Sequence, residues 1–232
     1  MAKRLFDIAL ATLALLLSAP FVAVAALGIL LSSPGPVFYR ARRVGRGGSV
    51  FTMYKLRTMH VTQDGTSAIT APGDVRIFPF GNLIRRLKID ELPQFWNILN
   101  GDMSVVGPRP EAPEIVDKIY TDWMRETLRV RPGITSPGAI YNYLMAEVLL
   151  DDTDPEGTYA RNLLPPKLAL ERAYLERATF FSDLVYIALT GWAIIAHVLR
   201  RDVRLPEVDI TNAHRWAPQG PYPNERTSQR HG

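Results

Sequence analysis

The sequence contains no cysteine among its 232 residues, which excludes disulfides, thiolate zinc sites and a cysteine nucleophile. Its four histidines (positions 60, 197, 214 and 231) are scattered, and no two have the spacing of metal ligands on one helical turn. The glycine-rich run at residues 45–48 matches neither a Walker loop nor a dinucleotide-binding motif, so it predicts a flexible turn. These absences exclude thiol chemistry, argue against a histidine metal centre and leave neither of two common nucleotide-binding loops.

Positive charge exceeds negative charge, with a formal net charge of +4 and a pI of about 9.4. This balance suits an anionic partner such as phosphate, a lipid headgroup or nucleic acid, but it does not choose among them. No nucleic-acid recognition motif accompanies the charge, so we expect no nucleic-acid partner. The mean hydropathy of −0.01 hides a strongly uneven distribution along the chain.

Residues 8–31 carry no charge and are long enough to cross a hydrocarbon core of about 30 Å. Basic residues flank the run on both sides, at positions 3, 4, 40, 42, 43 and 46. Because basic flanks prefer the cytoplasm, a single crossing would leave one of them on the wrong side. Pro20 should break the helix, and each half alone is too short to span. We therefore predict a re-entrant helix-break-helix membrane anchor; a spanning helix and a cleaved signal peptide are the alternatives.

The remaining pattern predicts a mostly α fold with a small β-hairpin, an α+β class. The predicted elements are strands at 37–41 and 50–56 and helices at 80–88, 93–99, 113–129 and 165–178. Residues 184–199 are nearly uncharged but short for a span, and arginines follow them. They predict a helix at the membrane interface, with a buried core helix as the alternative.

Three segments follow from this pattern. Residues 1–36 form the membrane hairpin and residues 37–204 a cytoplasmic domain with interfacial helices. Residues 205–232 are polar and proline-rich, and we expect this tail to be poorly ordered.

Two adjacent carboxylates, Asp90 and Glu91, lie at the predicted start of a helix, where Pro93 fits the first turn. The partial positive charge of a helix N-terminus favours an ionised carboxylate. Near a metal ion, such a group can attack phosphorus and form an acyl phosphate. The same pair can also simply decorate a helix start, and the residues alone do not separate these interpretations.

Basic residues accompany these acids along the chain. Arg85, Arg86 and Lys88 precede them, Lys55 and Arg57 end the second strand, and Arg109 and Arg131 adjoin prolines. Because guanidinium groups match phosphate oxygens bidentately, this setting predicts a phosphate-bearing membrane substrate. For each arginine alone, a solvated face or a headgroup contact is the alternative.

A further acidic triplet, Asp152-Thr153-Asp154, has the Asp-x-Asp pattern that holds a metal and a nucleotide diphosphate in many glycosyltransferases. No apolar strand precedes it, so we interpret it as a loop.

Several short segments together resemble the bacterial sugar transferases, the monotopic polyprenyl-phosphate phosphoglycosyl transferases. They are, in order, Lys3-Arg4-Leu5-Phe6-Asp7, the mid-run Pro20, Ser33-Pro34-Gly35-Pro36-Val37-Phe38, Tyr54-Lys55-Leu56-Arg57-Thr58-Met59, Asp90-Glu91-Leu92-Pro93-Gln94, Gly101-Asp102-Met103-Ser104, Val106-Gly107-Pro108-Arg109-Pro110 and Arg131-Pro132-Gly133-Ile134-Thr135. Each is weak alone, and their order and number carry the resemblance.

The resemblance implies a UDP-sugar donor, Mg²⁺ and an acceptor polyprenyl phosphate, at the cytoplasmic face of the bacterial inner membrane and in contact with its lipids. Asp90 would be the nucleophile and a metal ligand, expelling UMP and carrying the sugar phosphate until polyprenyl phosphate attacks it. Glu91 would act as an acid/base or organise the metal. Basic residues would hold phosphates: Lys55, Arg57, Arg85, Arg109 and Arg131. The reaction would initiate glycoconjugate or polysaccharide synthesis.

Two segments depart from the family pattern. Ala19, rather than serine, precedes the membrane proline, with Ser18 one position earlier, so the hydrogen bonding of the predicted break at Ser18 and Pro20 differs. After Thr135 the chain reads Ser136-Pro137-Gly138-Ala139 and then an acidic insertion, so the identity of the sugar does not transfer. A non-catalytic membrane scaffold and a metal-dependent glycosyltransferase releasing UDP remain alternative functions.

Overall fold

The structure is a computed structural model that describes residues 2–61, 69–70, 74–151, 153–199 and 201–226. Its elements, in order, are α1 (Ala2–Ser32), β1 (Phe38–Val44), η1 (Arg46–Gly48), β2 (Val50–Leu56), α2 (Pro79–Arg86), η2 (Ile89–Glu91), α3 (Gln94–Asn100), β3 (Ser104–Val106), α4 (Pro113–Ile119), α5 (Asp122–Arg125), η3 (Glu126–Arg129), β4 (Gly133–Thr135), α6 (Pro137–Leu149), α7 (Pro155–Thr158), η4 (Tyr159–Leu163), α8 (Leu164–Leu175), α9 (Phe180–Val198), α10 (Glu207–Ala213) and α11 (Pro223–Arg226). The described residues are mostly helical with small two-stranded sheets, which confirms the predicted α+β class.

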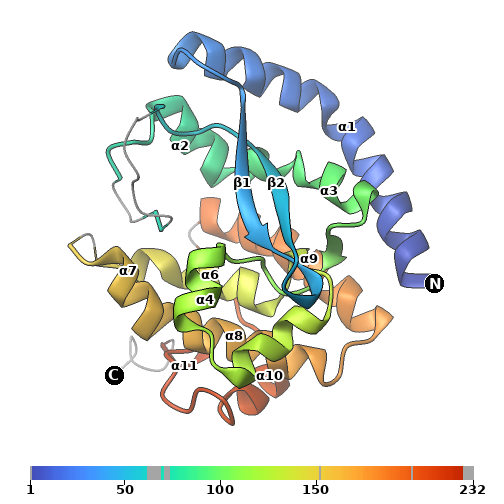
Figure 1. The fold of residues 1–232 in the computed structure, drawn as a ribbon, viewed down its shortest axis with the longest axis vertical. Helices are drawn as coiled ribbons and strands as arrows, with labels where there is room; N and C mark the ends of the chain where they lie inside the picture. Colours follow the sequence, from blue (N-terminus) through green and yellow to red (C-terminus); the bar gives the residue numbers. More distant parts are fainter. Residues whose placement is uncertain (1, 62–68, 71–73, 152, 200, 227–232) are drawn as a thin grey trace.

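Helix α1 is continuous through Pro20 and shows no interruption at the predicted break. The Ser18 hydroxyl lies 3.4 Å from the Leu15 carbonyl oxygen, one turn earlier. Figure 1 shows the helix changing direction along its course over one edge of the molecule. A bend without a break in the helix is the response that proline allows when only one backbone hydrogen bond is lost.

Buried polar contacts fix the N-terminal end of α1 to the rest of the molecule. Arg4 donates to the carbonyl oxygens of Ile98 (2.6 Å) and Leu99 (3.0 Å), at the end of α3. Asp7, which is buried, accepts from the Ser104 hydroxyl (2.9 Å) and from the Val105 N–H (3.1 Å) on β3. The first motif of the chain therefore attaches α1 to the C-terminus of one helix and to one strand.

The C-terminal end of α1 is fixed by Arg57, which follows β2. Its guanidinium donates to the Ser33 carbonyl (2.6 Å), the Ser33 hydroxyl (2.9 Å) and the Pro36 carbonyl (2.6 Å). Both ends of the apolar helix are thus held by the same globular body.

The strands β1 and β2 form the predicted antiparallel hairpin, in a register that runs from Phe38 opposite Leu56 to Val44 opposite Val50. A second sheet was not predicted: β3 and β4 pair in parallel, with Ser104 opposite Gly133. Glycines permit this pairing, because a methyl group added at Gly107 would lie 2.5 Å from the Arg131 carbonyl oxygen.

The helical predictions hold for α2, α3, α8 and α9, with shifted ends. Helix α3 ends at Asn100, and its C-cap, Gly101, has the left-handed conformation (φ 91°) that glycine adopts readily. The single helix predicted at 113–129 is wrong: Tyr120 is extended, and the segment divides into α4, α5 and η3.

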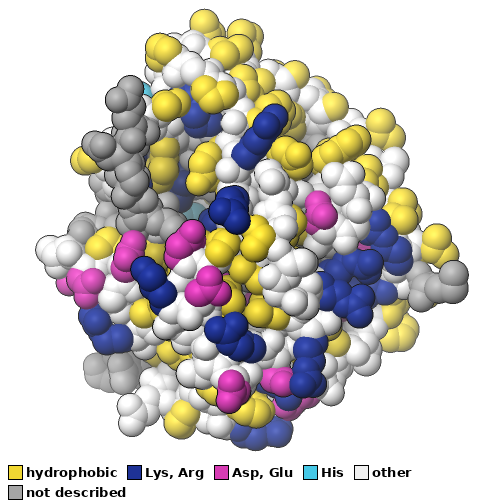
Figure 2. Space-filling view, in the orientation of Figure 1, with side chains coloured by type: hydrophobic (Ala, Val, Ile, Leu, Met, Phe, Trp, Pro, Cys, Tyr) yellow, Lys and Arg dark blue, Asp and Glu magenta, His cyan; other side chains and the backbone are white. Residues whose placement is uncertain are grey.

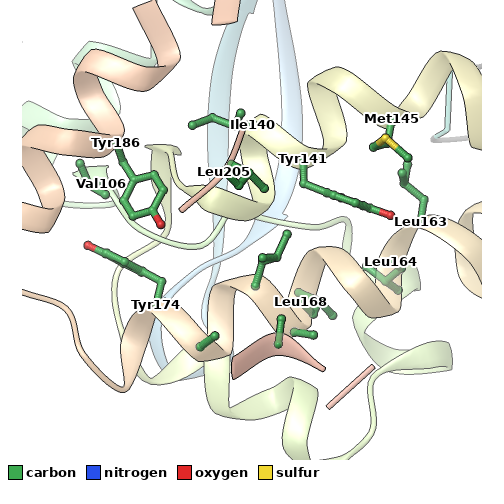
Figure 3. Packing of buried hydrophobic residues seen from close by; sticks show 14 of the residues in the cluster. Val106, Ile140, Tyr141, Met145, Leu163, Leu164, Leu168, Tyr174, Tyr186 and Leu205 are labelled. Carbon is green, nitrogen blue, oxygen red and sulfur yellow. The ribbon is translucent and has the colours of Figure 1, made fainter. Parts of the chain in front are cut away.

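The core is centred on α8, whose side chains pack against α6 and α9 (Figure 3). Helix α10 packs against α8 as well. The prediction of a poorly ordered tail is wrong for residues 205–226. Leu205, Ile210 and Tyr222 are buried in this core, and the buried Asp209 accepts from the Tyr186 hydroxyl.

The outer face of α1 leaves large apolar side chains exposed, including Leu16, Phe21 and Leu31. Figure 2 shows hydrophobic side chains gathered along the α1 edge, while most of the charged side chains on this face lie lower. In α9, Phe181 and Trp192 are also exposed, so this helix is not the buried core helix that we held as the alternative. By length and composition, α1 and α9 are the candidate membrane helices of the described residues.

Candidate active site

Asp90 and Glu91 lie in η2, a single 3₁₀ turn between α2 and α3. Pro93 follows at the N-cap of α3, which places the pair directly before that helix. Lys88 precedes the turn in the left-handed conformation (φ 58°), and it is the one residue other than glycine with positive φ in the described part of the chain. The chain therefore turns sharply where the carboxylates stand.

Three cations surround the Glu91 carboxylate. Its Oε1 lies 2.5 Å from Arg109 Nη2, 3.5 Å from Lys55 Nζ and 3.5 Å from Lys88 Nζ. Burial alone would raise the pKa of Glu91, but the cations, with Arg109 foremost, hold it well below its usual range. Glu91 is therefore an ionised anchor for cations at neutral pH and, without substrate, a poor proton donor.

Lys55 and Arg109 reach Glu91 from distant elements, β2 and the segment after β3. Burial lowers the pKa of Lys55 to about 8, and nearby Arg109 adds to this effect, whereas Glu91 opposes it. The Arg109 guanidinium also donates to the Ile134 carbonyl (3.2 Å), next to β4. The parallel pairing of β3 with β4 thus positions this arginine.

Asp90 differs from Glu91 in how its carboxylate oxygens are paired. It is 5% exposed, and its Oδ1 has no hydrogen-bond partner among the residues that the structure describes. Burial and the neighbouring Glu91 raise its pKa, against the attraction of Lys55 and Lys88. A buried oxygen without a partner in a basic setting is characteristic of a reactive or ligand-binding group.

The other predicted phosphate-binding arginines lie elsewhere. Arg85 lies 3.4 Å from the Thr58 hydroxyl and contributes positive charge near Asp90. Arg131 donates to the Gly101 carbonyl (2.8 Å). The donors of Arg57 are occupied at the end of α1. Lys55 and Arg109 are therefore brought to Glu91, whereas Arg57 and Arg131 are committed to backbone carbonyls; a phosphate role for any of them stays a prediction.

Three residues near the site escaped the sequence-based assignment. Gln94 is fully buried, and neither amide atom has a partner within the described ranges. Glu171 is fully buried on α8 and accepts from the Arg109 backbone N–H (3.2 Å) and the Ser136 hydroxyl (2.6 Å). Lys88, noted only as one of several basic residues, contacts Glu91 directly. Gln94 and Lys88 flank the acidic pair in sequence, but no local signal connects Glu171 to it.

Mg²⁺, the implied cofactor, would need oxygen ligands at this site. In the described residues, no cluster of three or more histidine, cysteine or acidic side chains could hold a metal ion. Mg²⁺ is commonly held by one or two carboxylates together with substrate phosphates. The unpaired Asp90 Oδ1 fits that pattern, provided that the phosphates come from a bound substrate.

The acidic triplet has a local structural task, as far as the structure describes it; Asp152 lies outside the described residues. Asp154 caps α7 by accepting from the Gly157 N–H (2.9 Å) and pairs with Arg161 (2.8 Å). Both side chains of that pair are mostly exposed. This agrees with the interpretation of the triplet as a loop.

An apolar cavity of about 510 Å³ lies between α1 and the segment that directly follows η2. Ser18 of α1 lines one side, Arg40 and Tyr54 of the hairpin another, and Leu92 with Pro93 a third. The cavity therefore adjoins both the apolar helix and the residues that directly follow Asp90 and Glu91.

The chain is similar in sequence to proteins of one family. The profile of the bacterial sugar transferase family matches residues 1–197. A UDP-glucose:undecaprenyl-phosphate glucose-1-phosphate transferase of Caulobacter vibrioides is 36% identical over 192 residues, 81% of this chain and 67% of that protein. An enzyme of the same name from Xanthomonas campestris is 44% identical over 199 residues, 84% of this chain and 39% of its own.

A third relative, from Aeromonas hydrophila, is a UDP-N-acetylgalactosamine-undecaprenyl-phosphate N-acetylgalactosaminephosphotransferase. It is 42% identical over 154 residues, which are 65% of this chain and 36% of that protein. The chain thus spans well under half the length of two of these relatives. Their names carry two different sugars, so similarity alone does not fix the sugar.

Proposed function

The chain belongs to the bacterial sugar transferase family, and on that premise we propose that it transfers a sugar 1-phosphate from a UDP-sugar to a polyprenyl phosphate, releasing UMP through a covalent intermediate on Asp90. The observation that carries the proposal is the buried Oδ1 of Asp90, which has no partner in the described part of the chain and stands beside a carboxylate that three cations surround. An oxygen left unpaired among cations is suited to meet an anionic substrate rather than to stabilise the fold.

In the first step, an oxygen of Asp90 attacks the β-phosphorus of the donor. The bond from that phosphorus to the bridging oxygen breaks, and UMP leaves with the electron pair. In the second step, an oxygen of polyprenyl phosphate attacks the same phosphorus and releases the Asp90 carboxylate. The acceptor thereby becomes a polyprenyl diphosphate sugar, and the enzyme is regenerated.

Charge stabilisation in both steps falls to the basic residues around Glu91. Lys55 and Arg109 are already ordered by this carboxylate, so they need little rearrangement to receive phosphate oxygens. Bound Mg²⁺, held by Asp90 and the donor phosphates, would neutralise charge on the diphosphate.

We further propose that the chain is monotopic, with α1 re-entrant at the cytoplasmic face of the plasma membrane. Arg4 and Asp7 hold one end of α1 to the globular body and Arg57 holds the other. A helix fixed at both ends to a body on one side of the membrane returns to that side. The basic flanks favour the cytoplasm as that side, and the exposed apolar face of α9 suits the interface.

The apolar cavity is the proposed place for the first part of the acceptor chain. Its volume of about 510 Å³ lies in the range of about 300–1,000 Å³ typical of ligand sites. Leu92 and Pro93, which line the cavity, follow Asp90 by only two and three positions. Helix α1 lines the opposite side and leads from the cavity to the lipid. A hydrocarbon chain entering from the membrane would thus lie beside the turn that carries the nucleophile.

The nucleotide product tests the reaction. We expect the full chain, with Mg²⁺, undecaprenyl phosphate and either UDP-glucose or UDP-N-acetylgalactosamine, to release UMP. The variant Asp90→Asn should lose activity by more than about a thousandfold, whereas Asp154→Asn should retain it. Release of UDP with the opposite pattern would identify a conventional glycosyltransferase, and no nucleotide release at all would favour the scaffold.

Two further experiments address the intermediate and the topology. Intact mass after donor addition alone should rise by one sugar phosphate in the wild type and not in Asp90→Asn. Because the chain lacks cysteine, thiols introduced by Ala2→Cys and Ser49→Cys report sidedness cleanly. We expect both thiols to be labelled from the cytoplasmic side. Labelling from opposite sides would exclude a re-entrant α1.

A further inference from the structure

Lys88 has a left-handed backbone conformation, which glycine adopts more readily than lysine. Its φ of 58° and ψ of 19° are left-handed, immediately after the C-cap of α2. Glycine commonly occupies this position in proteins because it adopts positive φ without steric conflict. A lysine at this position therefore lowers the stability of the folded protein relative to glycine, unless contacts of its side chain offset the strain. Strained residues of this kind concentrate at functional sites.

The side chain of Lys88 is held at two points. Its Nζ lies 3.5 Å from Glu91 Oε1 and 4.7 Å from the centre of the Tyr143 ring on α6. Tyr143 in turn lies 3.4 Å, through its hydroxyl, from the Arg86 carbonyl. The ring thus supports the ammonium next to the catalytic turn, through a cation–π contact.

Lys88 is also the most accessible of the three cations around Glu91. Its side chain is 32% exposed, against 20% for Lys55 and 16% for Arg109. Arg109 alone approaches Glu91 to 2.5 Å, so this carboxylate keeps its strongest partner when Lys88 moves away. A partly exposed ammonium with a dispensable partner can turn towards an arriving anion.

We propose that Lys88 is a donor-binding residue whose ammonium moves from Glu91 to the diphosphate of the nucleotide-sugar, with the Tyr143 ring as its support. The proposal rests on the proposed function, since it takes the donor to be a nucleoside diphosphate sugar. Lys88 lies two residues before Asp90, so a phosphate oxygen bound by it would stand near the nucleophile. Lysine suits this task because its compact charge lies at the end of a flexible side chain, which can change its contact from Glu91 to a phosphate oxygen.

Binding of UDP in the presence of Mg²⁺, measured by calorimetry on the detergent-solubilised full chain, tests the proposal without turnover. Lys88→Met keeps the length and the backbone strain but removes the charge. We expect its UDP affinity to fall by roughly 10- to 100-fold, the usual contribution of a charge-assisted hydrogen bond. Lys88→Arg should remain within about fivefold, because it keeps a cation.

A structural role for Lys88 would give a different result. Lys88→Gly relieves the left-handed strain, so its melting temperature should equal or exceed that of the wild type while UDP binding weakens as in Lys88→Met. Lys118→Met, at an exposed lysine of α4, is the matched control and should bind UDP normally. Tyr143→Leu should weaken binding, and Tyr143→Phe should preserve it.

Two outcomes would overturn the inference in distinguishable ways. If the wild type binds UDP and Lys88→Met binds it within about threefold, Lys88 does not contact the donor, and the proposed function is untouched. If the wild type itself binds neither UDP nor a UDP-sugar, the donor class is wrong and the proposed function fails with it.

Discussion

Replacing Lys55 by arginine should extend the activity of the enzyme into alkaline solution. Lys55 is largely buried on β2, and its Nζ lies 3.5 Å from Glu91. Burial lowers its pKa from 10.5 to about 8, because the charged ammonium is poorly solvated there. If the protonated form helps to bind the donor diphosphate, kcat/KM must fall as the pH rises through that value. Arginine stays protonated over the whole accessible range.

The size of the effect follows from the pKa. At pH 9, one unit above a pKa of about 8, roughly a tenth of the Lys55 side chains remain protonated. The kcat/KM of the wild type at pH 9 should therefore be about tenfold below its plateau, whereas that of Lys55→Arg should stay within about twofold of its own plateau. The absolute plateau of the variant is expected to be lower, because a guanidinium does not place its charge as an ammonium does.

UMP release, measured at low donor concentration from pH 6 to pH 10, gives the two profiles. Low donor concentration matters because kcat/KM reports the free enzyme, before phosphate binding raises the pKa of Lys55. Lys118→Arg serves as a control for the introduction of arginine and should keep the wild-type profile. An alkaline limb with the same midpoint in wild type and Lys55→Arg would show that another group, or the substrate, titrates there.

Three further predictions concern buried groups. Gln94→Leu removes two amide atoms that have no partner among the described residues. The free energy of unfolding of this variant should therefore rise by about 1–2 kcal/mol, while its rate of UMP release falls. A lower free energy of unfolding would contradict this prediction. Burial raises the pKa of Glu171 from 4.5 to about 7, so wild-type stability should fall as pH rises from 4.5 to 7. Glu171→Gln should lose that slope and be the more stable protein at pH 8 by thermal melting, with no advantage near pH 4. Asp7→Ala leaves Ser104 and the Val105 N–H unpaired and should lose about 2–4 kcal/mol of unfolding free energy in denaturant titration, whereas Asp7→Asn, which still accepts one bond, should lose less.

Local patterns in the chain determined a large part of this molecule. The uncharged run at residues 8–31 predicted the apolar helix α1, and the β-rich stretches on either side of the glycine-rich turn predicted the β1–β2 hairpin. Adjacent Asp90 and Glu91 before Pro93 placed the acidic pair directly before a helix. These features depend on neighbours in sequence, through hydropathy, β propensity and the conformational limits of proline and glycine, so sequence suffices to find them.

Only the tertiary structure determined which residues far apart in sequence contact one another. Arg57 and Arg109 looked equivalent as arginines near prolines or strand ends. Folding commits Arg57 to the carbonyls of Ser33 and Pro36 and brings Arg109 to Glu91. The pairing of β3 with β4 joins residues about thirty positions apart through three-residue strands, which are too short to show alternation.

The tertiary structure likewise determined which side chains are buried. The tail after Arg204 has a polar composition typical of disorder, but its few apolar residues, Leu205, Ile210 and Tyr222, fill the core beside α8. Glu171 and Gln94 lose their solvent for the same reason, because elements from other parts of the chain cover them. Composition records which side chains are polar, but only the packed chain determines which of them lack water and therefore have shifted pKa values or unpaired atoms.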